Sequence, residues 1–166
     1  RRTCETVLAS GFASVNVILG FDHEIFAEQL RGLPVRTSIN QHFGSGLSTS
    51  LKLGVAELPP SVDGVLVMLA DMPAVTAGDL KALTDAFLRS NGNAVIRATD
   101  HGKRGNPVIL PRSVFPEIAK LRGDVGAKPI VEGFDGNVVD VEIGAAASLD
   151  VDTAEAIKGA GGSLPV

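Results

Sequence analysis

The apolar run Val65–Ala70 constrains the fold of this chain more than any other segment. All six of its residues are apolar, and Asp71-Met72-Pro73 follows directly. A strand that is apolar on both faces has to be covered on both sides, as it is in parallel sheets with helices on each face. We therefore expect Val65–Ala70 to form an inner strand of an α/β sheet, with Asp71 exposed at its carboxyl end.

The rest of the chain alternates between short apolar runs and amphipathic stretches. This pattern predicts strands at Val15–Leu19, Val35–Ile39, Ala94–Thr99 and Val108–Leu110, an edge or hairpin strand at Val138–Ile143, and helices at Ile25–Leu30, Leu47–Leu58, Pro111–Leu121, Gly123–Val131 and Asp150–Lys158. Residues 1–166 are therefore predicted to form a single α/β domain, with a mostly parallel open sheet and helices on both faces, in a Rossmann-like arrangement.

The helix that follows Asp71 carries the clearest start signal. Thr76 stands where an N-cap residue belongs, and Asp79 stands three residues later as the acid of a capping box. Apolar residues at helical spacing predict the buried side of this helix, namely Leu80, Leu83, Phe87 and Leu88.

Composition excludes several classes of function. The net charge of −4 argues against a general nucleic-acid binder, which needs a basic face. No apolar run approaches the roughly 20 residues needed to span a bilayer, so no membrane partner is expected. Cys4 is the only cysteine and cannot form an internal disulfide, so a reducing cytoplasm is the expected location and a packing role the expected role.

Two carboxylates stand where a metal ion could bind. Ligands of open α/β sheets bind beyond the carboxyl ends of the strands, so Asp71 is well placed to hold a hard cation, with Pro73 restricting the backbone after it. Asp152 offers a second carboxylate, which suits Mg²⁺ because this ion takes one or two protein carboxylates. The alternatives are that Asp71 caps a turn and that Asp152 or Thr153 caps a helix.

Three Gly-containing loops could bind a ligand. Gly46–Ser50 leads into a helix and could hold a base or a phosphate, although it could equally be a plain connection. In Arg104–Pro107 and Gly123–Lys128 the cationic residue could pair with a phosphate, and the alternatives are a hairpin turn and a helix cap. The three histidines share no metal-ligand spacing and are expected on the surface or in loops, at His23, His42 and His101.

Four of these segments, in this order along the chain, resemble the MobA-like nucleotidyltransferases, which attach CMP or GMP to molybdopterin. The segments are Leu69–Thr76, Arg104–Val108, Gly123–Ala127 and Asp150–Thr153. The resemblance implies a fold like that of the nucleotide-diphospho-sugar transferases. The run Gly46–Leu51 is similar to the cytidylyltransferase branch, whereas the guanylyl branch tends to carry Gly-Pro-Leu-Ala-Gly there. CTP is therefore the implied donor and molybdopterin the implied acceptor.

The resemblance also implies roles for individual residues. Asp71 would be the catalytic residue that holds Mg²⁺ and contacts the nucleotide, with Asp152 as a second metal ligand. The loop carrying Gly46, Ser48 and Ser50 would contact the base. The acceptor side would be formed by Arg104, Gly105, Asn106, Asp124 and Gly126. A molybdoenzyme or its chaperone is implied as a further partner.

One part of the family pattern has no counterpart in the sequence. The family opens with a strand and a Gly-rich loop that grips the triphosphate, whereas Arg1 is expected to begin in the helix that follows them, so about thirty residues are expected to be missing from the domain. Three alternatives stay open. The same fold could use GTP, or another acceptor such as a sugar phosphate or methylerythritol phosphate, or the chain could be a non-catalytic nucleotide-binding module.

Overall fold

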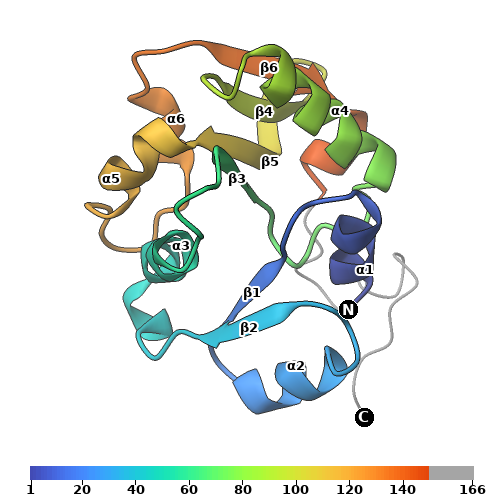
Figure 1. Ribbon diagram of the computed structural model, residues 1–166, viewed down its shortest axis with the longest axis vertical. Helices are drawn as coiled ribbons and strands as arrows, with labels where there is room; N and C mark the ends of the chain where they lie inside the picture. The colour runs from blue at the N-terminus through green and yellow to red at the C-terminus, as the bar shows by residue number, and fades with distance from the viewer. Residues whose placement is uncertain (150–166) are drawn as a thin grey trace.

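The computed structural model describes residues 1–149 (Figure 1). Its helices are α1 (Arg2–Ala9), α2 (His23–Gln29), α3 (Leu47–Ala56), α4 (Ala77–Arg89), α5 (Phe115–Ile118) and α6 (Lys128–Glu132), and its short 3₁₀ turns are η1 (Phe43–Ser45), η2 (Arg112–Val114) and η3 (Gly144–Ala147). Its strands are β1 (Asn16–Leu19), β2 (Arg36–Ile39), β3 (Gly64–Val67), β4 (Val95–Asp100), β5 (Lys103–Pro111) and β6 (Val138–Glu142). The predicted helix Asp150–Lys158 and the predicted metal ligand Asp152 lie outside the described residues.

The strands form two hydrogen-bonded groups. β1 pairs in parallel with β2, and a four-stranded sheet has the order β3-β5-β4-β6. In that sheet β5 is antiparallel to both β3 and β4, while β6 is parallel to β4, so three strands share one direction and β5 alone opposes them. Figure 1 shows the four-stranded sheet in the upper half of the view and the β1–β2 pair in the lower half. The predicted mainly parallel α/β fold is confirmed.

Strand β3 differs from its prediction in length and position. It ends at Val67, and within residues 1–149 it pairs only with β5, so it lies at the edge of the four-stranded sheet and not inside it. Val67 pairs with Val108, and the next residue of β5 in this direction is Pro107. Proline has no backbone N–H to donate, so the ladder stops there. The residues between Val67 and Asp71 therefore leave the strand.

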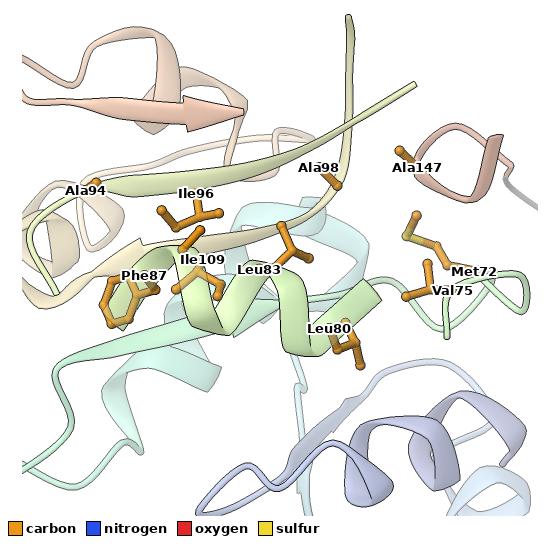
Figure 2. Packing of buried hydrophobic residues seen from close by; sticks show 11 residues of the cluster. Met72, Val75, Leu80, Leu83, Phe87, Ala94, Ile96, Ala98, Ile109 and Ala147 are labelled. Carbon is orange, nitrogen blue, oxygen red and sulfur yellow. The ribbon is translucent and has the colours of Figure 1, made fainter. Parts of the chain in front are cut away.

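Helices cover both faces of the four-stranded sheet, as predicted. One cluster of buried residues lies between α4 and one face (Figure 2), and it includes Leu80, Leu83 and Phe87 with Ile96, Ala98 and Ile109. A second cluster joins α3, α5 and α6 to the other face, and it includes Leu51, Ile118 and Ile130 with Val95, Val108 and Leu110. Neighbouring residues of β4 and β5 thus enter opposite clusters, which follows from the alternation of side chains along a strand.

Helix α4 begins as the sequence predicts. The Thr76 side chain accepts a hydrogen bond from the Asp79 backbone N–H, and the Asp79 side chain accepts one from the Thr76 N–H, which completes the capping box. A cap of this kind contributes about 1 kcal/mol to stability. Leu88 was expected in the buried stripe, but it is 65% exposed because it lies one residue, or about 100° around the helix, beyond the buried Phe87.

The structure locates three other predicted elements. The short helix predicted within Pro111–Leu121 is present as α5, which follows the turn η2 after Pro111 ends strand β5. The helix predicted over Gly123–Val131 begins only at Lys128, which leaves the preceding glycines in a loop. Within residues 1–149 the alternating segment 138–142 pairs only with β4, in parallel, so it is an edge strand there and forms no hairpin.

Two smaller expectations can also be checked. Cys4 lies half-buried in α1, and burial raises the pKa of its thiol, which fits a packing role. Among the described residues, no helix is both long and apolar enough to cross a membrane.

Candidate functional site

Asp71 lies in a turn just beyond the carboxyl end of β3, and the chain is anchored on both sides of it. The Thr3 hydroxyl of α1 donates a 2.8 Å hydrogen bond to the Ala70 carbonyl. On the other side Met72 is 1% exposed and packs in the cluster that contains Val75 and Ala147 (Figure 2). Asp71 itself is half-buried. The backbone that carries this carboxylate is therefore fixed by packing and by a hydrogen bond.

The carboxyl ends of β3, β4 and β6 meet at one edge of the sheet, because these three strands share a direction. Asp71 follows β3, Asp100 ends β4 and Glu142 ends β6. The antiparallel β5 starts at this same edge, at Lys103. This edge thus combines three carboxylates with the start of the strand that carries the Arg104–Pro107 motif.

That motif forms a bulge in β5 instead of the predicted turn. Between the pairs Arg97–Val108 and Thr99–Arg104, β4 contributes one residue and β5 contributes three, Gly105, Asn106 and Pro107. Bulges redirect side chains and are frequent beside active sites. Asn106 is half-buried, and its side-chain amide makes no hydrogen bond within residues 1–149. The amide is therefore free to bind a ligand.

Gly105 lets this bulge pack closely against η3. A Cβ atom placed on Gly105 would lie 2.3 Å from the Ala147 carbonyl oxygen and 2.8 Å from the Ala147 Cβ. Real Cβ atoms do not approach other heavy atoms so closely, so only glycine fits here. The contact fixes η3 against β5, near the same edge of the sheet as Asp71.

The sequence indicates that Arg104 could pair with a phosphate. Its guanidinium makes a 2.8 Å ion pair with Glu132 at the end of α6. Both side chains are largely exposed, so the pair contributes little to stability and a phosphate could displace it. Lys128 is exposed at the start of α6.

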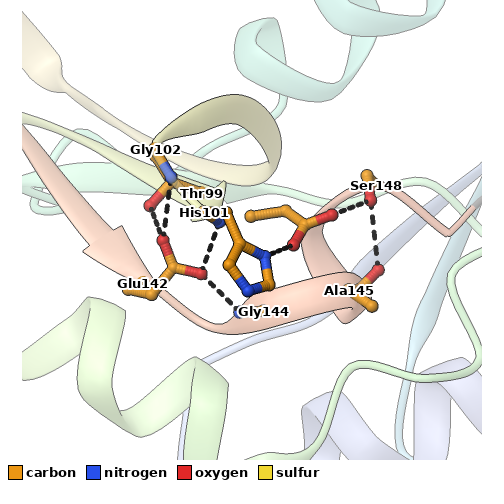
Figure 3. A network of polar contacts seen from close by, with 8 residues as sticks. Thr99, His101, Gly102, Glu142, Gly144, Ala145 and Ser148 are labelled. Atoms are coloured by element: carbon orange, nitrogen blue, oxygen red, sulfur yellow. Dashed lines mark hydrogen bonds and ion pairs between the residues drawn. The ribbon is translucent and has the colours of Figure 1, made fainter.

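A polar network that the sequence did not reveal connects β4 with β6 (Figure 3). Glu142 accepts hydrogen bonds from the His101 N–H at 2.8 Å, from the Gly102 N–H at 3.2 Å and from the Thr99 hydroxyl at 2.9 Å. These bonds lower the pKa of the Glu142 carboxyl, the one from His101 most of all. Glu142 thus holds the β4–β5 turn in place.

Asp100 and His101 form the second half of this network. Asp100 accepts a 2.6 Å hydrogen bond from the Ser148 hydroxyl and lies 2.7 Å from His101 Nδ1. The Ser148 bond and then the His101 bond lower the pKa of Asp100, and the bond to Asp100 raises the pKa of His101. One ligand atom each from Asp100, His101 and Glu142 lies within 4.8 Å of the others, a spacing that could hold a metal ion.

His101 is exposed, as the sequence predicted. Of its two acidic neighbours, only Asp100 could be recognised from the sequence. Asp100 is adjacent in the chain, whereas Glu142 is brought in by the pairing of Thr99 with Glu142 between β4 and β6. The only sequence signal was an acid at the end of each of two predicted strands. Since the carboxylates are already occupied by internal hydrogen bonds, the arrangement has a structural role without any metal.

The Gly46–Ser50 and Gly123–Ala127 loops, far apart in sequence, lie in contact. The Leu47 N–H donates a 3.0 Å hydrogen bond to Asp124 Oδ1, and the Ser48 N–H donates a 3.4 Å bond to the Gly123 carbonyl. A phosphate at the start of α3 would need these same backbone N–H groups as donors. Their use within the protein argues against the phosphate alternative and leaves a base contact or a plain connection for this loop.

The hydroxyl groups of this loop are directed into the protein. Ser48 is fully buried, and its hydroxyl has no hydrogen-bond partner among the described residues. Ser50 accepts a 2.9 Å hydrogen bond from the buried Asn40 amide, which also donates to Thr49 at 2.8 Å. Asn40 therefore fixes the start of α3 against the end of β2. A contact between this loop and a base remains a prediction, since the backbone N–H groups of Leu47, Ser48 and Thr49 are also used inside the protein.

An open pocket lies beside the same loop. Its volume is about 460 Å³, and its lining includes Asn40, His42, Ser45, Thr49 and Lys52. The Asn40 amide and the Thr49 hydroxyl are used inside the protein, so the Ser45 hydroxyl, the His42 imidazole and the Lys52 ammonium are the lining groups that suit a polar ligand. His23 takes no part in it and begins α2.

A family model described as "MobA-like NTP transferase domain" matches residues 1–139. No curated protein matches the chain.

Several solved structures share the fold. A Mycobacterium tuberculosis H37Rv protein, Rv0371c in complex with manganese, is 22% identical, with a TM-score of 0.81 over 96% of this chain and 83% of that chain. The 4-diphosphocytidyl-2C-methyl-D-erythritol synthase of Anaerococcus prevotii is 16% identical, with a TM-score of 0.78 over 96% of this chain and 82% of the other. Molybdopterin-guanine dinucleotide biosynthesis protein A of Archaeoglobus fulgidus is 16% identical, with a TM-score of 0.56 over 94% and 82%.

Proposed function

The chain belongs to the family of MobA-like NTP transferase domains and is a nucleotidyltransferase, and we propose that it transfers CMP from CTP to molybdopterin with release of pyrophosphate. The observation that carries this proposal is the position of Asp71 at the shared carboxyl edge of β3, β4 and β6, next to the bulge in β5. Such an edge is where open α/β sheets bind their ligands.

The metal in this proposal is Mg²⁺, held by Asp71 and Asp152. Carboxylate oxygens are the ligands that this hard cation prefers, so the donor set fits the ion. Ala147 lies in the same core cluster as Met72, and Asp152 is five positions further along the chain. A chain of this length reaches at most about 18 Å, so Asp152 is within range of the same edge. Bound metal would neutralise charge on the phosphates.

The transfer itself needs positioning more than covalent help from the protein. An oxygen of the acceptor phosphate attacks the α-phosphorus of CTP in line, and pyrophosphate leaves. The acceptor phosphate is already ionised near neutral pH, so no side chain has to remove a proton. The task of the protein is then to hold both substrates in line, which is worth several powers of ten in rate.

The Gly46–Ser50 loop supports CTP as the donor. Its sequence lacks the Gly-Pro-Leu-Ala-Gly run, and the pocket of about 460 Å³ beside it has room for a base with its sugar. Hydrogen-bonding groups around this pocket can read the edge of a base. A site built from such groups rejects the wrong base strongly, because that base leaves buried polar groups unpaired.

The acceptor side centres on Asn106. Its amide is half-buried, makes no hydrogen bond within residues 1–149 and stands on the bulge near the end of β3. Arg104, two residues away, would contribute to binding after leaving Glu132. Gly105 contributes by allowing the bulge to pack, and Gly126 by allowing its loop to approach Leu47, whose Cδ2 lies 3.1 Å from a Cβ built on Gly126.

The proposal also needs a site for the triphosphate. The family pattern supplies it through a strand and a Gly-rich loop, and we include such a segment in the proposal. Strand β3 supports it, because its residues are apolar, only partly buried and paired on one side within residues 1–149. A further strand beside β3 would cover these residues and use its free edge.

A second acceptor has a specific observation in its favour. The chain shares its fold, with a TM-score of 0.78, with 4-diphosphocytidyl-2C-methyl-D-erythritol synthase. A methylerythritol phosphate is therefore the alternative acceptor to test, and GTP is the alternative donor. With either acceptor the proposed location is the cytoplasm, where the single cysteine would stay reduced. If the acceptor is molybdopterin, the product would pass to a molybdoenzyme or its chaperone.

The test is a comparison of products. Full-length protein with Mg²⁺ is given CTP or GTP together with molybdopterin or 2C-methyl-D-erythritol 4-phosphate, and pyrophosphate and the nucleotidylated product are measured. We expect fast turnover only for CTP with molybdopterin, at least about 100-fold above GTP. Equal rates with both donors would contradict the cytidylyl assignment, and turnover of the methylerythritol phosphate alone would replace the acceptor. Nucleotide binding without any product would indicate a binding module.

A further inference from the structure

The start of α3 and the loop before α6 meet backbone to backbone, although 77 residues separate Leu47 from Asp124. We call this contact of Gly46, Leu47 and Ser48 with Gly123 and Asp124 the 46–124 junction. A Cβ atom on Gly46 would lie 2.5 Å from the Gly123 carbonyl carbon and 2.6 Å from both the N and the Cα of Asp124. No side chain fits between these two backbones.

The conformation of Gly46 also requires glycine. Its φ is +99°, a backbone region that other residues rarely adopt. Two independent constraints thus keep position 46 without a side chain. The junction is a built contact between two loops and not a chance proximity of flexible segments.

Asp124 secures the junction through its carboxylate. Its Oδ1 accepts the 3.0 Å hydrogen bond from the Leu47 N–H, so it supplies the cap that α3 lacks from its own N-cap residue, Gly46. A negative charge at this position is also favoured by the helix dipole. The 3.4 Å bond from the Ser48 N–H to the Gly123 carbonyl adds a second connection.

We propose that Asp124 is a positioning residue that acts through Leu47 and joins the nucleotide side of the site to the acceptor side. This inference rests on the proposed function, which assigns the Gly46–Ser50 loop to the base and the Gly123–Ala127 loop to the acceptor. Because the junction connects the two loops rigidly, ordering one loop orders the other. Nucleotide and acceptor then strengthen each other's binding by the same factor, as linkage requires.

The test uses two substitutions at one position and a matched control. Asp124→Ala removes the cap, Asp124→Asn keeps an oxygen that can accept from Leu47, and Asp79→Ala removes a comparable cap from α4, which lies outside the junction. The dissociation constant of CTP with Mg²⁺ is measured on the full-length protein, with and without molybdopterin. Amide hydrogen exchange at Leu47 and Ser48 is measured on the same samples.

We expect Asp124→Ala to weaken CTP binding about fivefold, the factor that corresponds to one lost cap, and to abolish the effect of molybdopterin on CTP affinity. Asp124→Asn should stay near the wild type. Asp79→Ala should lower the melting temperature but leave CTP affinity and the exchange of Leu47 unchanged.

Unchanged CTP affinity and unchanged coupling in Asp124→Ala, while the wild type binds and turns over CTP, would overturn the role of Asp124 alone. A wild type that binds no CTP would overturn the donor assignment, and the role of Asp124 as positioning residue would fall with it. Faster exchange at Leu47 in Asp124→Ala would then show the junction to be a purely structural cap.

Discussion

Asp71 and Asp124 show how two carboxylates of one domain can differ in what they are suited to do. Asp71 stands on backbone fixed from both sides, by the Thr3 bond to Ala70 and by the buried Met72. Asp124 uses its own oxygen to fix backbone elsewhere, at the start of α3. A fixed carboxylate suits a metal, whereas a carboxylate engaged in a cap suits positioning.

The sequence predicted the position of Asp71 better than the contact of Asp124. Asp71 follows an apolar run directly, and chain order alone places it at a strand end. The contact between Asp124 and Leu47 joins two loops that are far apart in the chain, so no local pattern encodes it. The same reason hid Glu142, whose partner His101 lies 41 residues away in the chain.

The Glu142 network leads to a prediction on pH dependence. The hydrogen bonds to Glu142 lower the pKa of its carboxyl from the usual 4.5, so the unfolded chain binds protons more readily than the folded chain in acid. The stabilisation by Glu142 is therefore present above about pH 4.5 and is lost as the pH falls below that value. Glu142→Gln lacks this titration. We expect the melting temperature of the variant to fall less than that of the wild type between pH 7 and pH 4, and equal losses would contradict the assignment.

At the scale of elements, strand β5 organises the site. Its bulge at Gly105–Pro107 ends the ladder with β3, presents Asn106 and receives η3. The sequence predicted strands on both sides of a Gly-rich turn between Thr99 and Val108, and the chain does reverse within this interval. The reversal occurs at His101-Gly102, where both residues have positive φ. Gly105 is a glycine for another reason, the close approach of Ala147.

Gly105→Ala tests this packing. The added Cβ would lie 2.3 Å from the Ala147 carbonyl oxygen, so β5 or η3 has to move. Forced overpacking costs typically about 1–3 kcal/mol, and we expect a loss of this size in the free energy of unfolding measured with urea. Gly78→Ala is the matched control, because a Cβ there meets only Thr76 Oγ1 at 3.6 Å and alanine favours the helix. A Gly105→Ala variant as stable as the control would show that η3 does not pack as described.

For the molecule as a whole, hydrophobic periodicity was sufficient to predict the layers of the fold but not the order of the strands. Apolar stripes at helical spacing and doubly apolar strands require helices on both faces, and the two core clusters confirm this. Periodicity does not give the direction of a strand, because β5 has the same apolar pattern as any other buried strand. That it turns back and inserts between β3 and β4 follows from long-range pairing, which leaves no mark in local hydrophobicity.

The central claim is that nucleotidyl transfer depends on the carboxylate of Asp71, and turnover of Asp71→Asn in the full-length protein tests it most directly. Asparagine keeps the shape but loses the charge that Mg²⁺ requires, so we expect pyrophosphate release from CTP to fall at least about 100-fold. Stability should change by only about 1 kcal/mol, since Asp71 lies in a turn outside the core. Asp63→Asn, at the amino end of the same strand, should turn over like the wild type. Near-normal turnover of Asp71→Asn would contradict the account.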